Sequence, residues 1–194
     1  VDGHGEDIRI QTYLPQNDAR QSVDNEESSS GIFVSSLHAD AMNREVVWNA
    51  ENVLGQHNIR YAYSVRAHHV RFEIPEGMPV PESYPAALAP YLADAAGIHK
   101  DDPQIERALN SIVPAENRTL LDALTRIHRH LQDKIANRNF SGYTDALTAL
   151  NLGEASCNGK SRLFVAMARK LNLPARLVGG FVMEQGSKRT SHQW

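Results

Sequence analysis

The first 74 residues alternate short apolar runs with polar, turn-forming stretches. At every second position from Ile8 to Leu14 the residue is apolar or β-branched, the period of a strand with one buried face. Such runs, separated by polar stretches such as Asp24–Ser30, predict a small antiparallel sheet or sandwich. The further runs are Gly31–Val34, Glu45–Trp48, Ile59–Val65 and Val70–Ile74.

The hydrophobic period changes after a proline-rich stretch, residues 75–85, whose composition is typical of a linker. Asp102 followed by Pro103 predicts an N-cap and a first helical turn. Thr119 and Asp122 fit a capping box in its acidic variant and open a second predicted helix, which runs to about Ile135 with apolar residues on one face. The predicted organisation is a β-rich domain over 1–74, a linker with a short helix over 75–101, and a core over 102–194.

The last fifty residues predict a helix followed by a hairpin. Ser156 or its neighbour would cap a helix whose first turn contains Cys157 and whose apolar positions, Leu163, Met167 and Leu171, share one face. Residues 173–183 would enter a strand, and the partner strand over 189–194 would carry His192.

Composition and charge exclude several classes of protein. The chain has 194 residues, 41% hydrophobic and 22% charged, which is typical of one globular domain or two small ones. A net charge of -3 and a pI near 6.3 give no basic surface for nucleic acid or an acidic membrane. No apolar run is long enough to cross a bilayer. The chain begins at Val1 without Met, which leaves a removed signal or anchor open.

A single cysteine excludes an internal disulfide and a thiolate metal cage. His128 and His130 lie two residues apart on a predicted helix and point in different directions, so they do not form a metal pair. These residues therefore give no metal site, and the reaction expected below implies no metal or organic cofactor. For Cys157 two interpretations remain: a buried apolar residue, or a nucleophile whose thiolate is favoured by the first turn of a helix. Backbone N–H groups there also suit the oxyanion of a tetrahedral intermediate.

His192 could deprotonate Cys157 if the strand brings the two within hydrogen-bond reach, or it could make a structural hydrogen bond. Trp194 would share a strand face with His192 and would pack beside the site or contact substrate.

These residues carry a resemblance to a known family. Cys157, the segment Arg162–Leu171, Leu173-Pro174-Ala175-Arg176, Gly180-Phe181 and His192-x-Trp194 follow one another as in the bacterial transglutaminase-like superfamily. The resemblance is close from about Asp145 to Trp194 and looser back to Asp102. It implies an α+β protein, with an antiparallel β domain ahead of a papain-like helical and β-sheet core. It also implies Cys157 as nucleophile and His192 as base.

Two departures from the family pattern are visible. The Asp that orients the histidine in this family is not among these residues, since its strand would follow Trp194. Residues 158–160 also lack the acidic residue often found after the cysteine.

The resemblance implies attack of a thiolate on a peptide or protein carboxamide, with hydrolysis favoured over amine cross-linking. The alternative is an inactive binding or regulatory module, attached to a membrane only through segments absent from this chain. The expected partner is a peptide or protein substrate. An extracytoplasmic (periplasmic) location is favoured over a cytoplasmic one, because a β domain precedes the core in a chain that lacks an initial Met.

Overall fold

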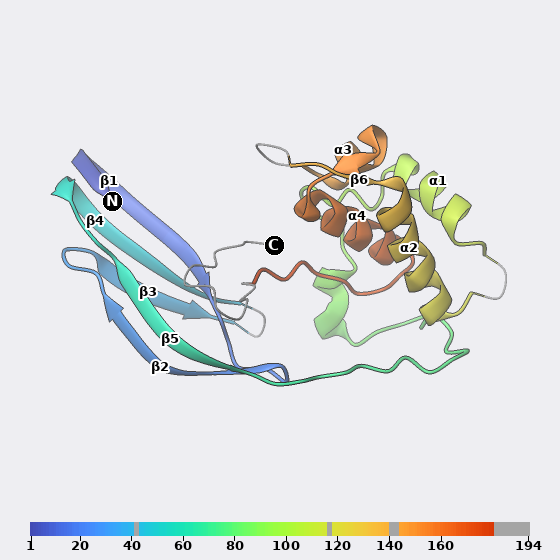
Figure 1. Cartoon of the computed structure of the whole chain (residues 1–194), viewed down its shortest axis with the longest axis horizontal. Coiled ribbons are helices and arrows are strands. Elements are labelled where there is room, and N and C mark those ends of the chain that lie inside the picture. The colour runs from blue at the N-terminus through green and yellow to red at the C-terminus, as the bar shows by residue number, and fades with distance from the viewer. Residues whose placement is uncertain (41–42, 116–117, 140–143, 181–194) are drawn as a thin grey trace. The chain divides into compact units, whose positions relative to one another are not determined.

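The structure is a computed structural model that describes residues 1–40, 43–115, 118–139 and 144–180. These residues form two compact units, Val1–Phe72 and a second unit that begins at Glu73 (Figure 1). The first is built of antiparallel strands and the second mainly of helices, which agrees with the predicted order of a β domain and a helical core.

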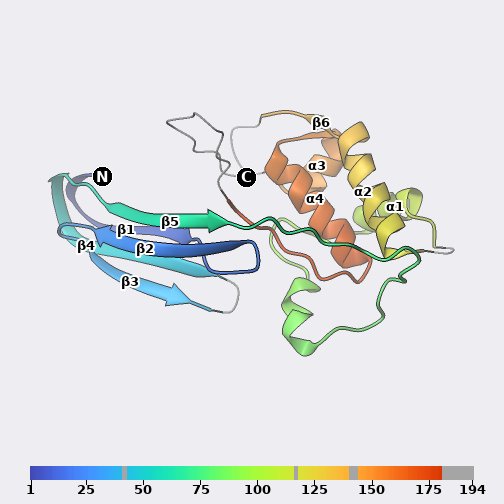
Figure 2. The ribbon, with the colours of Figure 1, turned by 60° about the horizontal axis from the view of Figure 1, so that its bottom comes forward.

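The strands of the first unit are β1 (Asp2–Leu14), β2 (Gln21–Ser29), β3 (Val34–Ala39), β4 (Arg44–Gln56) and β5 (Arg60–Ala67). They form a three-stranded sheet in the order β1-β4-β3 and a two-stranded sheet of β2 and β5. Strands β2 and β5 lie side by side in both views (Figure 1, Figure 2). All of these pairs are antiparallel.

Side chains of both sheets share one core. The predicted alternation in β1 is observed: Ile10 pairs with Trp48 and Thr12 pairs with Val46 on the same face of the sheet. Tyr61 of β5 packs against this face, with its ring edge-on to that of Trp48 at a centroid distance of 6.2 Å. The buried members of this core are Leu14, Phe33, Val46, Trp48 and Val53.

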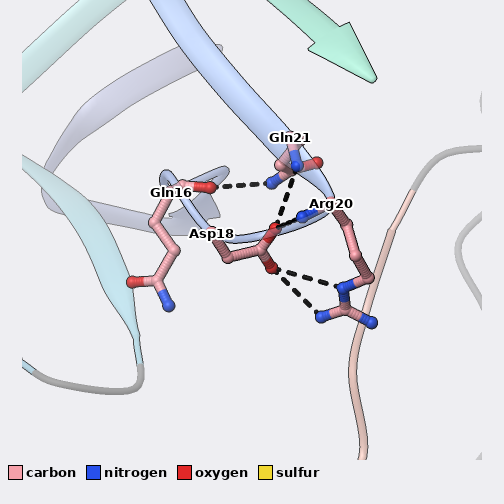
Figure 3. A network of polar contacts seen from close by, with 4 residues as sticks. All are labelled: Gln16, Asp18, Arg20 and Gln21. Carbon is pink, nitrogen blue, oxygen red and sulfur yellow. Dashed lines mark hydrogen bonds and ion pairs between the residues drawn. The ribbon is translucent and has the colours of Figure 1, made fainter. Parts of the chain in front are cut away.

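Polar side chains fix the connection from β1 to β2, which leads from one sheet to the other (Figure 3). The carboxylate of Asp18 accepts hydrogen bonds from the backbone N–H groups of Arg20 at 2.7 Å and Gln21 at 3.0 Å. The Gln21 side chain donates to the Gln16 carbonyl at 2.9 Å. A short Asp side chain is suited to this role, since it can bond to backbone groups two and three residues onward.

Two predictions for the first unit are wrong. Asp24–Ser30 was predicted as a turn but lies mostly in β2, and Val70–Ile74 was predicted as a strand but has no regular structure. The polar strand β2 forms because β5 supplies its main-chain hydrogen bonds, and Glu26 finds partners in Arg44 at 2.7 Å and Tyr61 at 2.6 Å. Among the described residues no strand pairs with the apolar run from Val70, and Phe72 is exposed.

A third prediction is displaced along the chain. The run Gly31–Val34 was expected to be a strand, but β3 begins only at Val34. Phe33 lies in a turn, with its N–H donating to the Ser30 carbonyl at 3.0 Å, and its side chain is buried in the core.

The second unit contains η1 (Ala86–Tyr91), a 3₁₀ helix, and the α-helices α1 (Pro103–Ile112), α2 (Leu120–Lys134), α3 (Ala146–Leu152) and α4 (Cys157–Lys170). Two short strands, β6 (Ala136–Asn137) and β7 (Glu154–Ala155), pair in parallel. The predicted caps of α1 and α2 are confirmed. Asp102 accepts from the Gln104 N–H at 2.8 Å, and Thr119 accepts from the Asp122 N–H at 3.2 Å.

One apolar core lies among these helices. It contains the predicted stripe of α2 at Ile127, Leu131 and Ile135, which is therefore confirmed. The other buried members are Ile98, Ile105, Leu109, Val113, Ala123, Ala146, Ala149, Ala155, Leu163, Val165, Ala166, Met167, Ala168, Leu171 and Leu173.

The proline-rich stretch lies along this helical unit. The Met78 carbonyl accepts a hydrogen bond from the Leu120 N–H at 2.8 Å, and the Asn172 side chain donates to the Glu82 carbonyl at 3.1 Å. Val80 packs against the core. Within the described residues, no helix is both long and apolar enough to span a membrane.

The stripe of α2 gives a direct test of which side chains stabilise the helical unit. We expect Ile127→Ala to lower the free energy of unfolding by about 2–5 kcal/mol, because Ile127 is fully buried and its truncation leaves a cavity. Leu121→Ala in the same helix is the matched control, since Leu121 is 39% exposed. Urea denaturation followed by circular dichroism measures both changes, and equal losses would contradict the assigned core.

Candidate functional site

Cys157 lies in the first turn of α4, as predicted, where it is the first residue of the helix, and it is exposed. The interpretation of Cys157 as a buried apolar residue is therefore wrong. The Ser156 hydroxyl accepts a hydrogen bond from the Gly159 N–H at 3.5 Å, which confirms the predicted cap. The remaining N–H groups of the first turn have no acceptor within the helix, and they place the positive end of the helix dipole at Cys157.

Much of the rest of α4 is buried. The predicted apolar face, Leu163, Met167 and Leu171, lies in the core and is confirmed. Gly159 and every residue of 165–169 are buried as well. A helix buried on more than one face cannot rotate or slide without disrupting its packing, so the position of Cys157 is fixed by the core.

The residues just before Cys157 are held by the chain that follows α2. The Ala136 N–H donates to the Gly153 carbonyl at 2.8 Å, and the Arg138 N–H donates to the Ala155 carbonyl at 3.0 Å. The Arg138 guanidinium also pairs with the Glu154 carboxylate at 2.6 Å. These contacts set the direction in which the chain enters α4. The sequence gives no signal for them, because they join residues more than fifteen positions apart.

Gly159 allows a close approach between the first turn of α4 and the segment before α3. A Cβ atom at this position would lie 2.9 Å from the Ala155 Cβ and 2.9 Å from the Thr144 Cγ2. Thr144 is itself buried, and its carbonyl accepts a hydrogen bond from Arg162 at 2.9 Å. The sequence offers no direct signal for this contact, because Gly159 lies inside a helix where alanine would be preferred.

Asp145 caps α3 beside this contact. Its carboxylate accepts from the Thr148 N–H at 2.7 Å and lies 3.3 Å from the His99 Nε2. Burial raises the pKa of the Asp145 carboxyl, but hydrogen bonds from the backbone and side chain of Thr148, together with His99, outweigh burial and hold the pKa below its ordinary value. This cap was not predicted, although Asp145 followed by the apolar residues Ala146 and Leu147 is a sequence signal that could have indicated it.

Arg169 fixes the chain that leaves α4. Its guanidinium is buried and donates to the carbonyls of Ala175 at 2.9 Å and Ala93 at 2.7 Å. The Ala175 N–H in turn donates to the Tyr91 carbonyl at 3.0 Å. Burial lowers the pKa of Arg169, and Asp94 opposes that effect. The sequence gives no local signal for this role, because Arg169 and Lys170 are both basic residues in the last turn of α4.

His192 and Trp194 lie outside the described residues, as does Tyr143. The approach of His192 to Cys157 and the packing of Trp194 therefore stay predictions. Among the described residues no group of three His, Cys, Asp or Glu side chains is placed to hold a metal ion.

A family model described as the transglutaminase-like superfamily matches residues 107–194, the segment that contains α4 and Cys157. This segment belongs to that superfamily. The superfamily predicted from the order of motifs around Cys157 is thus confirmed. No curated protein sequence matches the chain.

A solved structure has the same fold. It is that of a candidate cysteine protease from Cytophaga hutchinsonii, with a TM-score of 0.74 and 14% sequence identity. The match covers 94% of this chain, so it includes most of both units, and the chain spans 64% of the length of that protein. The predicted α+β fold class, with an antiparallel β unit ahead of a transglutaminase-like core, is confirmed.

The contact at Gly159 predicts a penalty for the smallest possible side chain. We expect Gly159→Ala to lower the free energy of unfolding by about 1–3 kcal/mol, because the rigid Cβ of Ala155 cannot move aside without displacing backbone. The close contact must therefore cost more than the replacement of glycine by alanine gains in helix propensity, about 1 kcal/mol. Thermal and urea unfolding measure the change.

Gly179→Ala is the control, since a Cβ there would meet nothing within 4 Å. Thr144→Ser removes the Cγ2 atom that the new methyl would meet, so the double variant should recover part of the loss. A neutral or stabilising Gly159→Ala variant would contradict the close packing of this turn.

Asp145 gives a pH-dependent prediction. A carboxyl whose pKa is lowered on folding stabilises the folded state above its unfolded pKa of about 3.9, and this contribution is lost as the pH falls through the folded value. We expect Asp145→Ala to cost about 1 kcal/mol at pH 7 through loss of the cap, and the difference from the wild type to shrink below about pH 4.

Unfolding by urea between pH 2.5 and 7 follows this difference. Asp101→Ala is the matched control, because the Asp101 side chain is 62% exposed and pairs with the Lys100 ammonium at 3.0 Å. A cost for Asp145→Ala that stays constant to the lowest pH would contradict the assigned role of the carboxylate.

Proposed function

We propose that this chain carries the catalytic cysteine of an enzyme that cleaves peptide or protein amides. The observation that carries the proposal is the exposure of Cys157 at the first residue of α4, inside the segment that belongs to the transglutaminase-like superfamily. The description of the structural relative as a candidate cysteine protease supports the same class of chemistry.

In the proposed reaction His192 takes the proton of the Cys157 thiol, and the thiolate sulfur attacks the amide carbonyl carbon. The N–H groups in the first turn of α4 suit the developing oxyanion, because helix geometry leaves them without intrahelical acceptors. The C–N bond then breaks, the amine leaves with the proton from His192, and a thioester remains. Water attacks the thioester, which releases the acid and restores the thiol.

Hydrolysis is proposed over transfer to an amine, and the scheme needs no metal or organic cofactor. Trp194 is proposed to pack beside the site, and an Asp beyond Trp194 is proposed to orient the imidazole. The proposed location is extracytoplasmic.

The rate of alkylation of Cys157 by iodoacetamide as a function of pH tests the proposal. An imidazolium close to the sulfur favours the thiolate, so we expect His192→Ala to lower the rate at pH 7 by about tenfold or more and to change the shape of the pH profile. The matched control is His128→Ala, since His128 is exposed on α2.

Turnover completes the test. Cys157→Ser should abolish release of amine from a peptide amide, whereas His128→Ala should leave it unchanged. Identical alkylation profiles in the wild type and His192→Ala, together with no turnover, would reject the enzyme and favour the inactive binding module.

A further inference from the structure

The three-stranded sheet of the first unit ends at β1 on one side and at β3 on the other. The β1 edge carries the features that natural proteins use to prevent further pairing. Its register with β4 is irregular between His4 and Ile8, and Gly5 has a φ of 98°. Its charged side chains are Asp2, Glu6, Asp7 and Arg9.

The β3 edge lacks this protection. Its sequence, Val-Ser-Ser-Leu-His-Ala, contains no Asp, Glu, Lys, Arg or Pro. It pairs with β4 in an unbroken register from Val34, opposite Asn49, to Ala39, opposite Arg44. All six residues are exposed, and the apolar Val34 and Leu37 are 74% and 53% exposed. A regular, uncharged edge strand presents a row of backbone groups to any further strand.

The two-stranded sheet offers no comparable edge. β2 carries Asp24, Glu26 and Glu27 and has a register shift between Asp24 and Glu27, while β5 carries Arg60 and Arg66. Among the strands described in the first unit, only β3 combines an outer position with a regular register and no charged residue.

We infer that β3 pairs with β3 of a second copy of this chain, so that two three-stranded sheets join into one antiparallel sheet across a two-fold axis. A two-fold axis brings identical strands together in opposite directions, which is the antiparallel arrangement. An edge without charges can pair with its own copy without like-charge repulsion. The charged edges described above would bring like charges of the two copies together.

The side chains of β3 suit a register centred on Leu37. Leu37 pairs with Val46, which is buried in the core, so Leu37 lies on the core face of the sheet. Residues directly opposite in an antiparallel pair share a face, and centring on Leu37 therefore places Leu37 against Leu37 of the second copy. The apolar surface that Leu37 exposes would be covered by an identical side chain.

On the other face this register places Ser36 opposite His38 of the second copy. Within one chain the Ser36 hydroxyl and the His38 Nε2 already lie 3.1 Å apart, at hydrogen-bond distance. The same two groups would then face each other twice across the axis. Self-complementarity on both faces favours a second copy over an extended segment of an unrelated protein, which would use only the backbone groups.

Sedimentation equilibrium of the 194-residue chain over a range of concentrations tests the inference. We expect a reversible monomer–dimer equilibrium, and Leu37→Lys should raise its dissociation constant at least tenfold, because two ammonium groups would face each other. Tyr13→Lys is the matched control, since Tyr13 is 68% exposed on β1 and should leave the equilibrium unchanged.

A cross-link tests the register. In a Cys157→Ser background, Leu37→Cys should give a disulfide-linked dimer under mild oxidation, because the two sulfurs would lie opposite each other. Arg9→Cys on β1 should not. Any of three results would overturn the inference. The wild type could stay monomeric at every concentration, Leu37→Lys could dimerise as well as the wild type, or cross-linking could be equal at both positions.

Discussion

Helix α4 must be buried along its length and yet begin at the surface, and the rest of the helical unit is arranged around that constraint. Its residues from Gly159 to Arg169 are mostly buried, while Cys157, two residues before Gly159, is exposed. A cysteine in the middle of this helix would be enclosed by the core and inert. Placing it at the first residue keeps the thiol accessible, while the rigidity of a packed core still fixes its position.

The two ends of α4 are held by different means. At the beginning, Ser156 caps the helix, and Gly159 allows the segment at Thr144 to approach the first turn closely. At the end, the last turn carries Arg169 and Lys170, whose positive charges favour the negative end of the helix dipole. Burying a guanidinium is costly, and the carbonyls of Ala93 and Ala175 offset that cost by accepting its hydrogen bonds.

Local chemistry explains which features could be predicted from the sequence. The caps at Asp102, Thr119 and Ser156 are recognisable because the capping side chain and its N–H partner lie within three residues of each other. The apolar stripes of α2 and α4 are equally local. Strand β2 was missed because its stability comes from pairing with β5, about forty residues away, and a polar sequence gives no hint of that partner.

The candidate site likewise contains features that could be predicted from local sequence and features that could not. The place of Cys157 at a helix start followed from its neighbours, whereas the contact between Gly159 and Thr144 depends on two segments packing together. Arg169 shows most clearly what the sequence does not reveal. Arg169 and Lys170 are adjacent basic residues, but only Arg169 is buried. Lys170 pairs with Glu106 at 3.2 Å at the surface, and Arg169 is buried between two carbonyls. The planar guanidinium, with several donors in fixed directions, satisfies both carbonyls at once.

This arrangement bears on how a base could reach the thiol. Ala175 lies on the segment that follows α4, and Arg169 ties Ala175 to the helix that carries Cys157. The Ala175 N–H is bonded to Tyr91, so the segment is held from both sides. The starting point of the chain that leads to His192 is thus fixed relative to Cys157 within one packed unit. The roles proposed for Cys157 and His192 need such a common frame, because a misplacement of about 1 Å can cost two orders of magnitude in rate.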